Sequence, residues 1–168
     1  VKSDYPIESG WPTRMTNRAV RGLELLNADT SISFDEFSAI KHDNAYSPRY
    51  RGYAYLSSVA ELAPDGPEEA QALSLIRNWD LHTDTANRSA ALGVCILLEE
   101  WQAERTGSAL PDGRETLHTC MDSVRDVAGQ LDPEWGTVQQ HGRGQRTWPA
   151  AGGPDTLRAM YAEQLEDE

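Results

Sequence analysis

The sequence predicts a mainly α-helical fold of about six or seven helices. Apolar residues recur at the i, i+3, i+4, i+7 spacing of a helix face through most of the chain. Runs that alternate apolar and polar residues, which would indicate strands, are nearly absent. With 168 residues, 39% hydrophobic and 25% charged, the chain has a globular composition and enough length to bury a core. We expect one helical domain or fragment over residues 1–168, with an irregular lead-in at 1–15, a helical core at 16–131, and a loop-rich segment and last helix at 132–168.

The first two helices have recognisable starting signals. Thr16 suits the N-cap of a helix that runs to about Asn27. Ser33 and Glu36 form the capping-box pattern, in which each residue satisfies a free backbone N–H of the other, and this predicts a short second helix. We expect the buried stripe of the second helix to consist of Phe34, Phe37 and Ile40.

A proline marks the expected start of each of the next two helices. Pro48 suits the first turn of a third helix that reaches about Leu62 and carries several tyrosines. Pro67 opens a fourth helix, with Glu68 and Glu69 in its first turn, where the helix dipole favours acidic side chains. The inner face of this helix is expected to be Ala70, Leu73, Ile76 and Trp79.

A fifth helix, about 86–105, is the most apolar and should lie at the centre of the packed cluster, with Gly107 at its end. A sixth helix is expected over 113–131. Its inward positions are Leu117, Cys120, Met121, Val124, Val127 and Leu131. Beyond it, 137–139 and 146–148 are expected to be brief strands, and Pro154 opens a last helix.

Charge and composition exclude several classes of function. The net charge of -12 opposes binding to nucleic acid. The longest apolar run, 90–98, is about half of the roughly 18 residues that a membrane helix needs, so we expect no membrane insertion. Residues 1–10 do not have the pattern of a signal peptide. Cys95 and Cys120 could pair or remain two buried thiols, and base rates favour the thiols.

The sequence also gives little support for a metal or cofactor site. No two of the four histidines are spaced as ligands on one helix face, and His118 and Cys120, at i and i+2, point apart. Asp80, His82 and Asp84 alternate in a linker and could bind a cation, but a solvated loop is the simpler interpretation. No serine lies in a Gly-x-Ser-x-Gly motif, and no phosphate-binding glycine loop is present.

Three groups of polar residues have both a functional and a structural interpretation. His42-Asp43 lies at a helix end, where a histidine more often interacts with the helix dipole than acts as a catalyst. Arg14 and Arg18 share a helix face, and in so acidic a chain the nearby arginines, Arg21 included, are expected to pair with local carboxylates. The segment 152–156 could offer backbone N–H groups to an anion, although glycines that merely allow a tight turn are the favoured interpretation.

Several short motifs follow one another over most of the chain, from about Tyr5 to Ala159. In order they are Asn17-Arg18-Ala19-Val20-Arg21-Gly22-Leu23-Glu24-Leu25-Leu26, Ser31-Ile32-Ser33-Phe34-Asp35-Glu36-Phe37, Ile40-Lys41-His42-Asp43, Leu75-Ile76-Arg77-Asn78-Trp79-Asp80, Arg88-Ser89-Ala90-Ala91 with Trp101, Trp135-Gly136-Thr137-Val138, and Gly152-Gly153-Pro154-Asp155-Thr156-Leu157-Arg158-Ala159. Each motif is common alone, but the ordered set resembles the middle of the β-subunit of the penicillin acylase family. The branch that it resembles most contains the lactone and lipopeptide acylases.

The resemblance implies an N-terminal-nucleophile hydrolase. In this family a precursor cleaves itself into α and β chains, and the freed N-terminal Ser attacks an amide carbonyl with its own α-amine as base, in a covalent acyl transfer assisted by an oxyanion hole. The catalytic core is an αββα sandwich, from which the helical stretch matched here is an excursion. The implied partners are the remaining α- and β-chain portions and a small-molecule acyl amide substrate. The implied location is the periplasm or the outside of the cell.

The sequence also departs from the family pattern. Val1 is not a nucleophile, and the oxyanion-hole Asn and the closing strands are expected outside this chain. By the resemblance, Arg18 matches an arginine that orients catalytic groups in some members, so it is the one candidate for a supporting catalytic role. No metal or cofactor is implied.

We therefore expect a helical segment of an amidohydrolase that is inactive alone and shapes the acyl-binding cleft. The alternative is a non-catalytic helical interaction module. Exposed apolar surface would favour the segment, and a polar surface all round would favour the module. A third possibility, an enzyme of another kind, would be indicated by Arg14, Arg18, His42 and Asp43 converging in one cleft with shifted pKa values.

Overall fold

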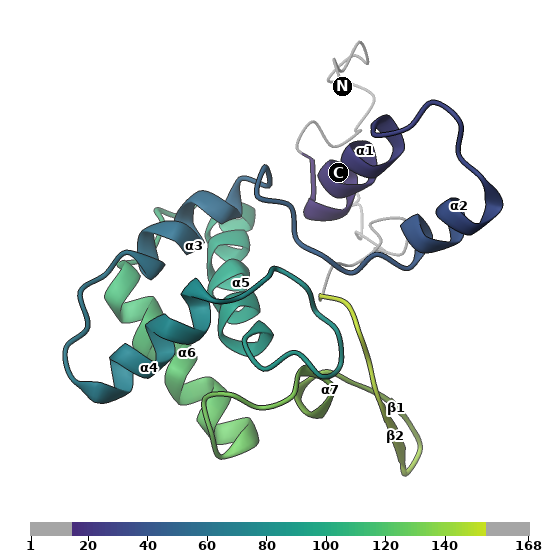
Figure 1. The fold of residues 1–168 in the computed structure, drawn as a ribbon. Coiled ribbons are helices and arrows are strands. Elements are labelled where there is room, and N and C mark those ends of the chain that lie inside the picture. Colours follow the sequence, from purple (N-terminus) through teal and green to yellow (C-terminus); the bar gives the residue numbers. More distant parts are fainter. Residues whose placement is uncertain (1–14, 154–168) are drawn as a thin grey trace, which may run out of the picture.

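A computed structural model describes residues 15–153 (Figure 1). In this part of the chain the fold is mainly helical, as predicted, with seven helices and one two-stranded sheet. The elements are α1 (Asn17–Asn27), α2 (Phe34–Lys41), α3 (Gly52–Ala60), α4 (Pro67–Arg77), α5 (Ala90–Thr106), α6 (Gly113–Ala128), α7 (Trp135–Val138), β1 (Gln140–Arg143) and β2 (Arg146–Pro149). The expected last helix from Pro154 lies outside the described residues. No helix of residues 15–153 is long and apolar enough to cross a bilayer.

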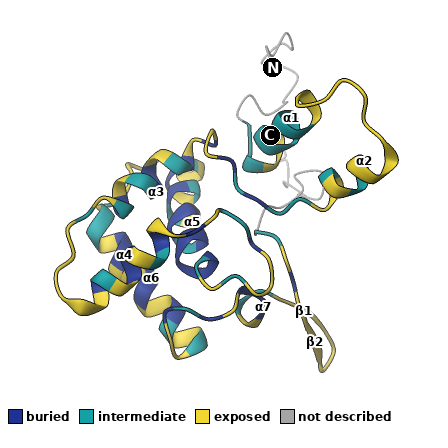
Figure 2. Cartoon of the chain, viewed as in Figure 1, coloured by how far each residue is buried: buried dark blue, intermediate teal, exposed yellow. Residues whose placement is uncertain are grey.

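Helices α3 to α6 form the core of the protein, and α5 lies at its centre, as its composition predicted. It contacts α3, α4 and α6, and Leu92, Val94 and Ile96 are almost wholly buried (Figure 2). Gly107 in the left-handed conformation follows its last residue. The start of α5 is later than expected, because the side chain of Asn87 accepts hydrogen bonds from the backbone N–H groups of Ser89 and Ala90.

A disulfide between Cys95 and Cys120 joins α5 to α6. The base-rate preference for two free thiols was therefore wrong. The two positions are 25 residues apart on different helices, and only the packing of those helices brings their Cα atoms to 5.7 Å. Nothing in the local sequence indicates this proximity.

Helix α2 has the predicted capping box but not the predicted buried stripe. Ser33 and Glu36 satisfy each other's backbone N–H groups. However, Phe34 is 83% exposed and Phe37 is 53% exposed, while Ile40 is partly buried. The stripe was wrong because α2 packs mainly against α1, and no second layer of the described chain covers its apolar face (Figure 1).

Other boundaries also differ from the predictions. Residues 48–51 form a turn, so α3 begins at Gly52 rather than at Pro48. The segment expected as a first strand belongs mostly to the short helix α7, and the strand itself follows it as β1. Val127 is 67% exposed because it lies on the outer side of the last turn of α6. The hairpin of β1 and β2 is exposed along its whole length.

The buried carboxylate of Glu69 joins α4 to α6. It accepts hydrogen bonds from the backbone N–H of Asp65 at 2.7 Å and from Arg114 Nη1 at 2.5 Å, and His118 Nε2 lies 2.6 Å from its other oxygen. The backbone N–H of Asp65, then His118 and Arg114, lower the pKa of Glu69 to about 2. Because these partners favour the charged form, the cluster stabilises the fold only while Glu69 is ionised.

This cluster predicts a loss of stability in acid. The pKa of Glu69 is lower in the folded chain than in the unfolded chain, so its contribution is complete above pH 4.5 and is lost as the pH falls toward 2. We expect Glu69→Gln to lower the thermal midpoint at pH 7 and to reduce the further fall between pH 5 and pH 3. The measurement is thermal unfolding followed by circular dichroism, with Glu115→Gln, an exposed acidic residue in the first turn of α6, as the matched control. An equal acid-induced fall in the variant and the parent would contradict the assignment.

Candidate functional site

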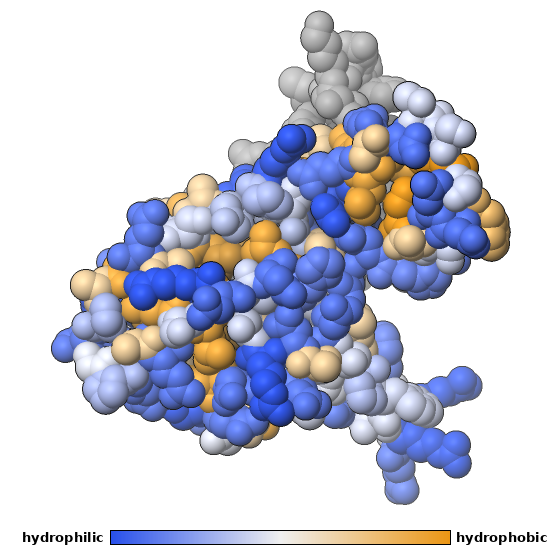
Figure 3. Space-filling model, in the orientation of Figure 1, coloured by the Kyte–Doolittle hydropathy of each residue, from blue (hydrophilic) through white to orange (hydrophobic). Residues whose placement is uncertain are grey.

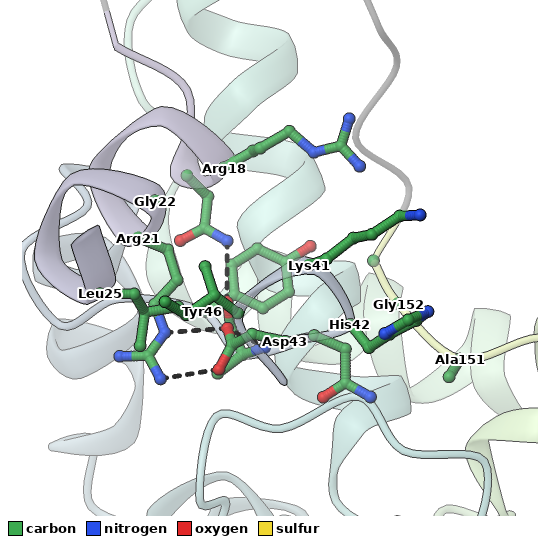
Figure 4. Close-up of a pocket in the computed structure, with 15 residues that line it drawn as sticks. Arg18, Arg21, Gly22, Leu25, Lys41, His42, Asp43, Tyr46, Ala151 and Gly152 are labelled. Carbon is green, nitrogen blue, oxygen red and sulfur yellow. Dashed lines mark hydrogen bonds and ion pairs between the residues drawn. The ribbon is translucent and has the colours of Figure 1, made fainter. Parts of the chain in front are cut away.

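The largest concentration of the predicted functional residues lies around one pocket. It has a volume of about 400 Å³ and is bounded by α1, by residues 40–46 at the end of α2 and beyond, and by residues 151–153 (Figure 4). Arg18, His42 and Asp43 all line it, whereas Arg14 lies outside the described residues. The convergence of Arg14, Arg18, His42 and Asp43 in one cleft would have indicated an enzyme of another kind. Three of these four residues share this pocket.

The start of α1 is fixed against the pocket floor by Asn17. Its side-chain N–H donates to the carbonyl of Ala45 at 3.2 Å, and its side-chain oxygen accepts from the backbone N–H of Ser47 at 2.8 Å. Ser47 in turn donates its hydroxyl to Glu24 at 2.6 Å. These bonds connect one face of α1 to a loop about 30 residues away, which sets the direction of the neighbouring Arg18.

Arg21 and Asp43 form a two-pronged ion pair across the pocket. Arg21 Nε and Nη2 donate to the two oxygens of Asp43 at 2.9 and 2.8 Å, and Asp43 also accepts from the backbone N–H of Ala45. The hydrogen bond from Arg21 lowers the pKa of Asp43, and the same bond raises the pKa of Arg21. The expectation that the arginines pair with local carboxylates is confirmed for Arg21. Asp43 is thus held as a carboxylate that joins two segments, which does not provide a free general base.

Arg18 and His42 occupy different parts of the same pocket. Both are exposed, and Arg18 forms no ion pair within residues 15–153. His42 caps the end of α2, and its Nδ1 lies 2.7 Å from the carbonyl oxygen of Ser38, which agrees with a helix-end role. Figure 4 shows the side chains of Arg18, Lys41 and His42 extending on one side of the pocket, away from the Arg21–Asp43 pair.

Residues 151–153 close the pocket, and their role was only partly foreseen. Gly152 adopts a φ of 97°, its N–H donates to the carbonyl of Thr83, and its carbonyl accepts from Trp135 Nε1. A Cβ on Gly153 would lie 2.2 Å from the hydroxyl oxygen of Tyr46. These contacts support the tight-turn interpretation of the glycines. The contributions of Lys41 and Tyr46 to the pocket were missed, because they depend on contacts between distant segments.

The linker residues Asp80, His82 and Asp84 do not converge on a common point. Asp80 accepts from the backbone N–H of His82 and from Asn87, whereas Asp84 accepts from Asn44. Within the described part of the chain no group of His, Cys, Asp or Glu side chains is arranged to hold a metal ion. The solvated-loop interpretation fits these contacts.

Comparison with known proteins gives one result at the level of the family. A family model described as penicillin amidase matches residues 1–166. No curated protein sequence matches the chain.

Proposed function

The chain belongs to the penicillin amidase family, and from this premise we propose that it is the helical segment of a β-subunit of an N-terminal-nucleophile acylase. In this proposal the enzyme cleaves a linear amide bond, and this segment shapes the acyl-binding cleft without supplying the nucleophile. The branch whose motifs the chain resembles most is that of the lactone and lipopeptide acylases. Family membership supports an acylase-like amidohydrolase, and the finer assignments rest on the resemblance of the ordered motifs.

The reaction would be a covalent acyl transfer. The hydroxyl of an N-terminal serine outside this segment attacks the amide carbonyl, and its proton passes through the α-amine to the leaving amine. Water then cleaves the acyl ester and releases a carboxylic acid. The described pocket contains no serine or cysteine, and its one carboxylate is bound by Arg21.

The observation that carries the proposal is the exposed apolar surface on α1, on α2 and on the loop between them. We define the α1–α2 patch as Leu26, Ile32, Phe34 and Phe37, all of which are exposed (Figure 3). Contiguous exposed apolar surface marks an interaction site. It favours a segment whose remaining α- and β-chain portions cover this face over a module with a polar surface.

Arg18 is the residue that we propose for a supporting catalytic role. Its guanidinium group is exposed at the rim of the pocket and is not neutralised by a carboxylate of the described chain. A guanidinium group in this state can donate several hydrogen bonds to catalytic groups brought by another portion of the enzyme. The Asn17 contacts fix the helix turn from which Arg18 projects.

We also propose the periplasm or the outside of the cell as the location. Disulfides persist in oxidising compartments and are rare in the cytosol. The Cys95–Cys120 bridge supports this location independently of the family resemblance.

Amide hydrolysis by two preparations tests the proposed function. The 168-residue chain alone should release no chromogenic amine from acyl nitroanilides, whereas the chain assembled with the other portions of the acylase should release it. In the assembled enzyme Arg18→Ala should lower kcat about ten-fold or more if a charged hydrogen bond is lost. Arg146→Ala in the exposed hairpin is the matched control.

The isolated chain provides a second arm of this test. It should bind a hydrophobic dye or self-associate through the α1–α2 patch, and Phe34→Ser with Phe37→Ser should remove most of that signal. Amide cleavage by the isolated chain would overturn the proposal that another portion of the enzyme supplies the nucleophile. An isolated chain that stays monodisperse and does not bind the dye would favour the interaction module.

A further inference from the structure

The charges around the pocket are unlike those of the rest of the chain. The protein has a net charge of -12, yet the pocket is lined by Arg18, Arg21, Lys41 and His42 and by a single carboxylate, Asp43. The two oxygens of Asp43 are occupied by Arg21 and by the backbone N–H of Ala45. The pocket therefore keeps an excess of positive charge after its one ion pair is formed.

The two remaining cations have no partner in the described structure. Neither Arg18 nor Lys41 forms an ion pair with any carboxylate of residues 15–153. In contrast, most other arginines of the helical body pair with an acidic side chain, among them Arg51, Arg88, Arg114 and Arg125. Within residues 15–153, Arg18 and Lys41 thus differ from most arginines of the helical body, whose charge is balanced by a carboxylate.

Arg18 and Lys41 are both exposed, and each belongs to a helix. Arg18 follows Asn17, which is bonded to Ala45 and Ser47, and Lys41 is the last residue of α2. The two side chains come from different helices and extend on the same side of the pocket, with His42 beside them (Figure 4). A ligand in the pocket therefore meets cationic side chains from both helices.

The rest of the lining is partly apolar. Leu25 and Ile40 are partly buried and line the pocket, and Gly22, which has no side chain, lines it as well. A Cβ on Gly22 would meet nothing within 4 Å, so the space beside this turn of α1 is open. The pocket of about 400 Å³ can hold a small ligand that combines a short hydrocarbon body with an anionic end.

We infer that this pocket binds an organic carboxylate, with the carboxylate on Arg18 and Lys41 and the hydrocarbon body against Leu25 and Ile40. The ligand class rests on the proposed function, because hydrolysis of an acyl amide creates a carboxylate in the acyl half that the substrate lacked. A carboxylate in the amine half of the substrate would have the same chemistry. The guanidinium group can bind both carboxylate oxygens, and the ammonium group adds a point charge.

Binding to the full 168-residue chain tests this inference by calorimetry at low salt. Hexanoate represents the acyl half, leucine represents a carboxylate of the amine half, and hexanamide is the uncharged analogue of hexanoate. We expect hexanoate to bind at least about ten-fold more tightly than hexanamide, because charged hydrogen bonds to the carboxylate are lost in the amide. Binding should weaken as salt is added.

Charge-neutral variants locate the site. Arg18→Gln and Lys41→Gln should each weaken hexanoate binding about five-fold, as expected for solvent-exposed charge pairs. Arg146→Gln, which removes an exposed cation from the hairpin, should change nothing. Both pocket residues are exposed, so circular dichroism should show an unchanged fold.

Each outcome has one meaning. Tighter binding of leucine than of hexanoate, with the same sensitivity to Arg18 and Lys41, supports the carboxylate site and assigns it to the amine half. Equal binding of hexanoate and hexanamide, binding that is unchanged in both variants, or no binding of either carboxylate overturns the inference. Because the readout is binding rather than turnover, failure here leaves amide cleavage to be judged by its own assay.

Discussion

Replacing both Cys95 and Cys120 by alanine is expected to lower the free energy of unfolding by about 3.5 kcal/mol, by the chain-entropy estimate for a disulfide loop of this length. The bridge spans 25 residues and joins α5 to α6, the central pair of helices in the core. Most of the effect comes from the unfolded chain, which gains conformational freedom when the loop is opened. For a domain of this size the thermal midpoint should fall by roughly 10 °C.

Denaturant unfolding of the oxidised parent, the reduced parent and the double variant measures this effect. Reduced parent and double variant should have similar midpoints, with the variant slightly lower because Cys120 is fully buried and alanine leaves a small void. The matched control is Ser38→Ala on α2, which is far from the bridge and should leave the midpoint within about 0.5 kcal/mol of the parent. A double variant as stable as the oxidised parent would show that the bridge does not stabilise this fold.

Several helix ends could be predicted from the sequence. Thr16, the Ser33–Glu36 pair, Pro67 and Gly107 act through bonds or steric limits within a few residues, and the structure places each at the expected helix end. Asn87 also acts locally, but its bonds to the following N–H groups were not recognised, so the start of α5 was placed too early.

What covers a helix face is not a local property. Phe34 and Phe37 have the spacing of a buried stripe, but the spacing says only that the two side chains share a face. Their exposure follows from the absence of a second layer over α2 in the described chain. The disulfide is a similar case, since a separation of 25 residues carries no sign of the 5.7 Å between the two Cα atoms.

The candidate site shows the same difference between what local sequence predicts and what contacts between distant segments decide. Arg18 could be named from its place in a motif, and Asp43 from its neighbour His42. The pairing of Asp43 with Arg21 joins positions 22 residues apart, and the bonds of Asn17 to Ala45 and Ser47 reach further. Which arginine is neutralised and which stays available is decided by these long-range bonds, so the charge of the pocket emerges only in the folded chain.

Gly93→Ala is expected to lower the free energy of unfolding by about 3 kcal/mol, at the upper end of the usual cost of overpacking a core. A Cβ at position 93 would lie 2.1 Å from Trp79 Cε3, because the indole ring lies against the backbone of α5. The ring cannot easily withdraw. Trp79 is buried, and its Nε1 donates to the carbonyl of His82 at 2.8 Å, so moving the ring breaks that bond or opens a void on its far side.

Gly22→Ala is the matched control, because it makes the same chemical change within a helix where a Cβ meets nothing within 4 Å. It should raise the free energy of unfolding by about 0.5–1 kcal/mol, since alanine favours the helix and restricts the unfolded chain. The two substitutions should therefore shift urea midpoints in opposite directions with similar slopes. If Gly93→Ala were as stabilising as Gly22→Ala, the close packing of Trp79 on α5 would be refuted, and helix propensity rather than space would govern position 93.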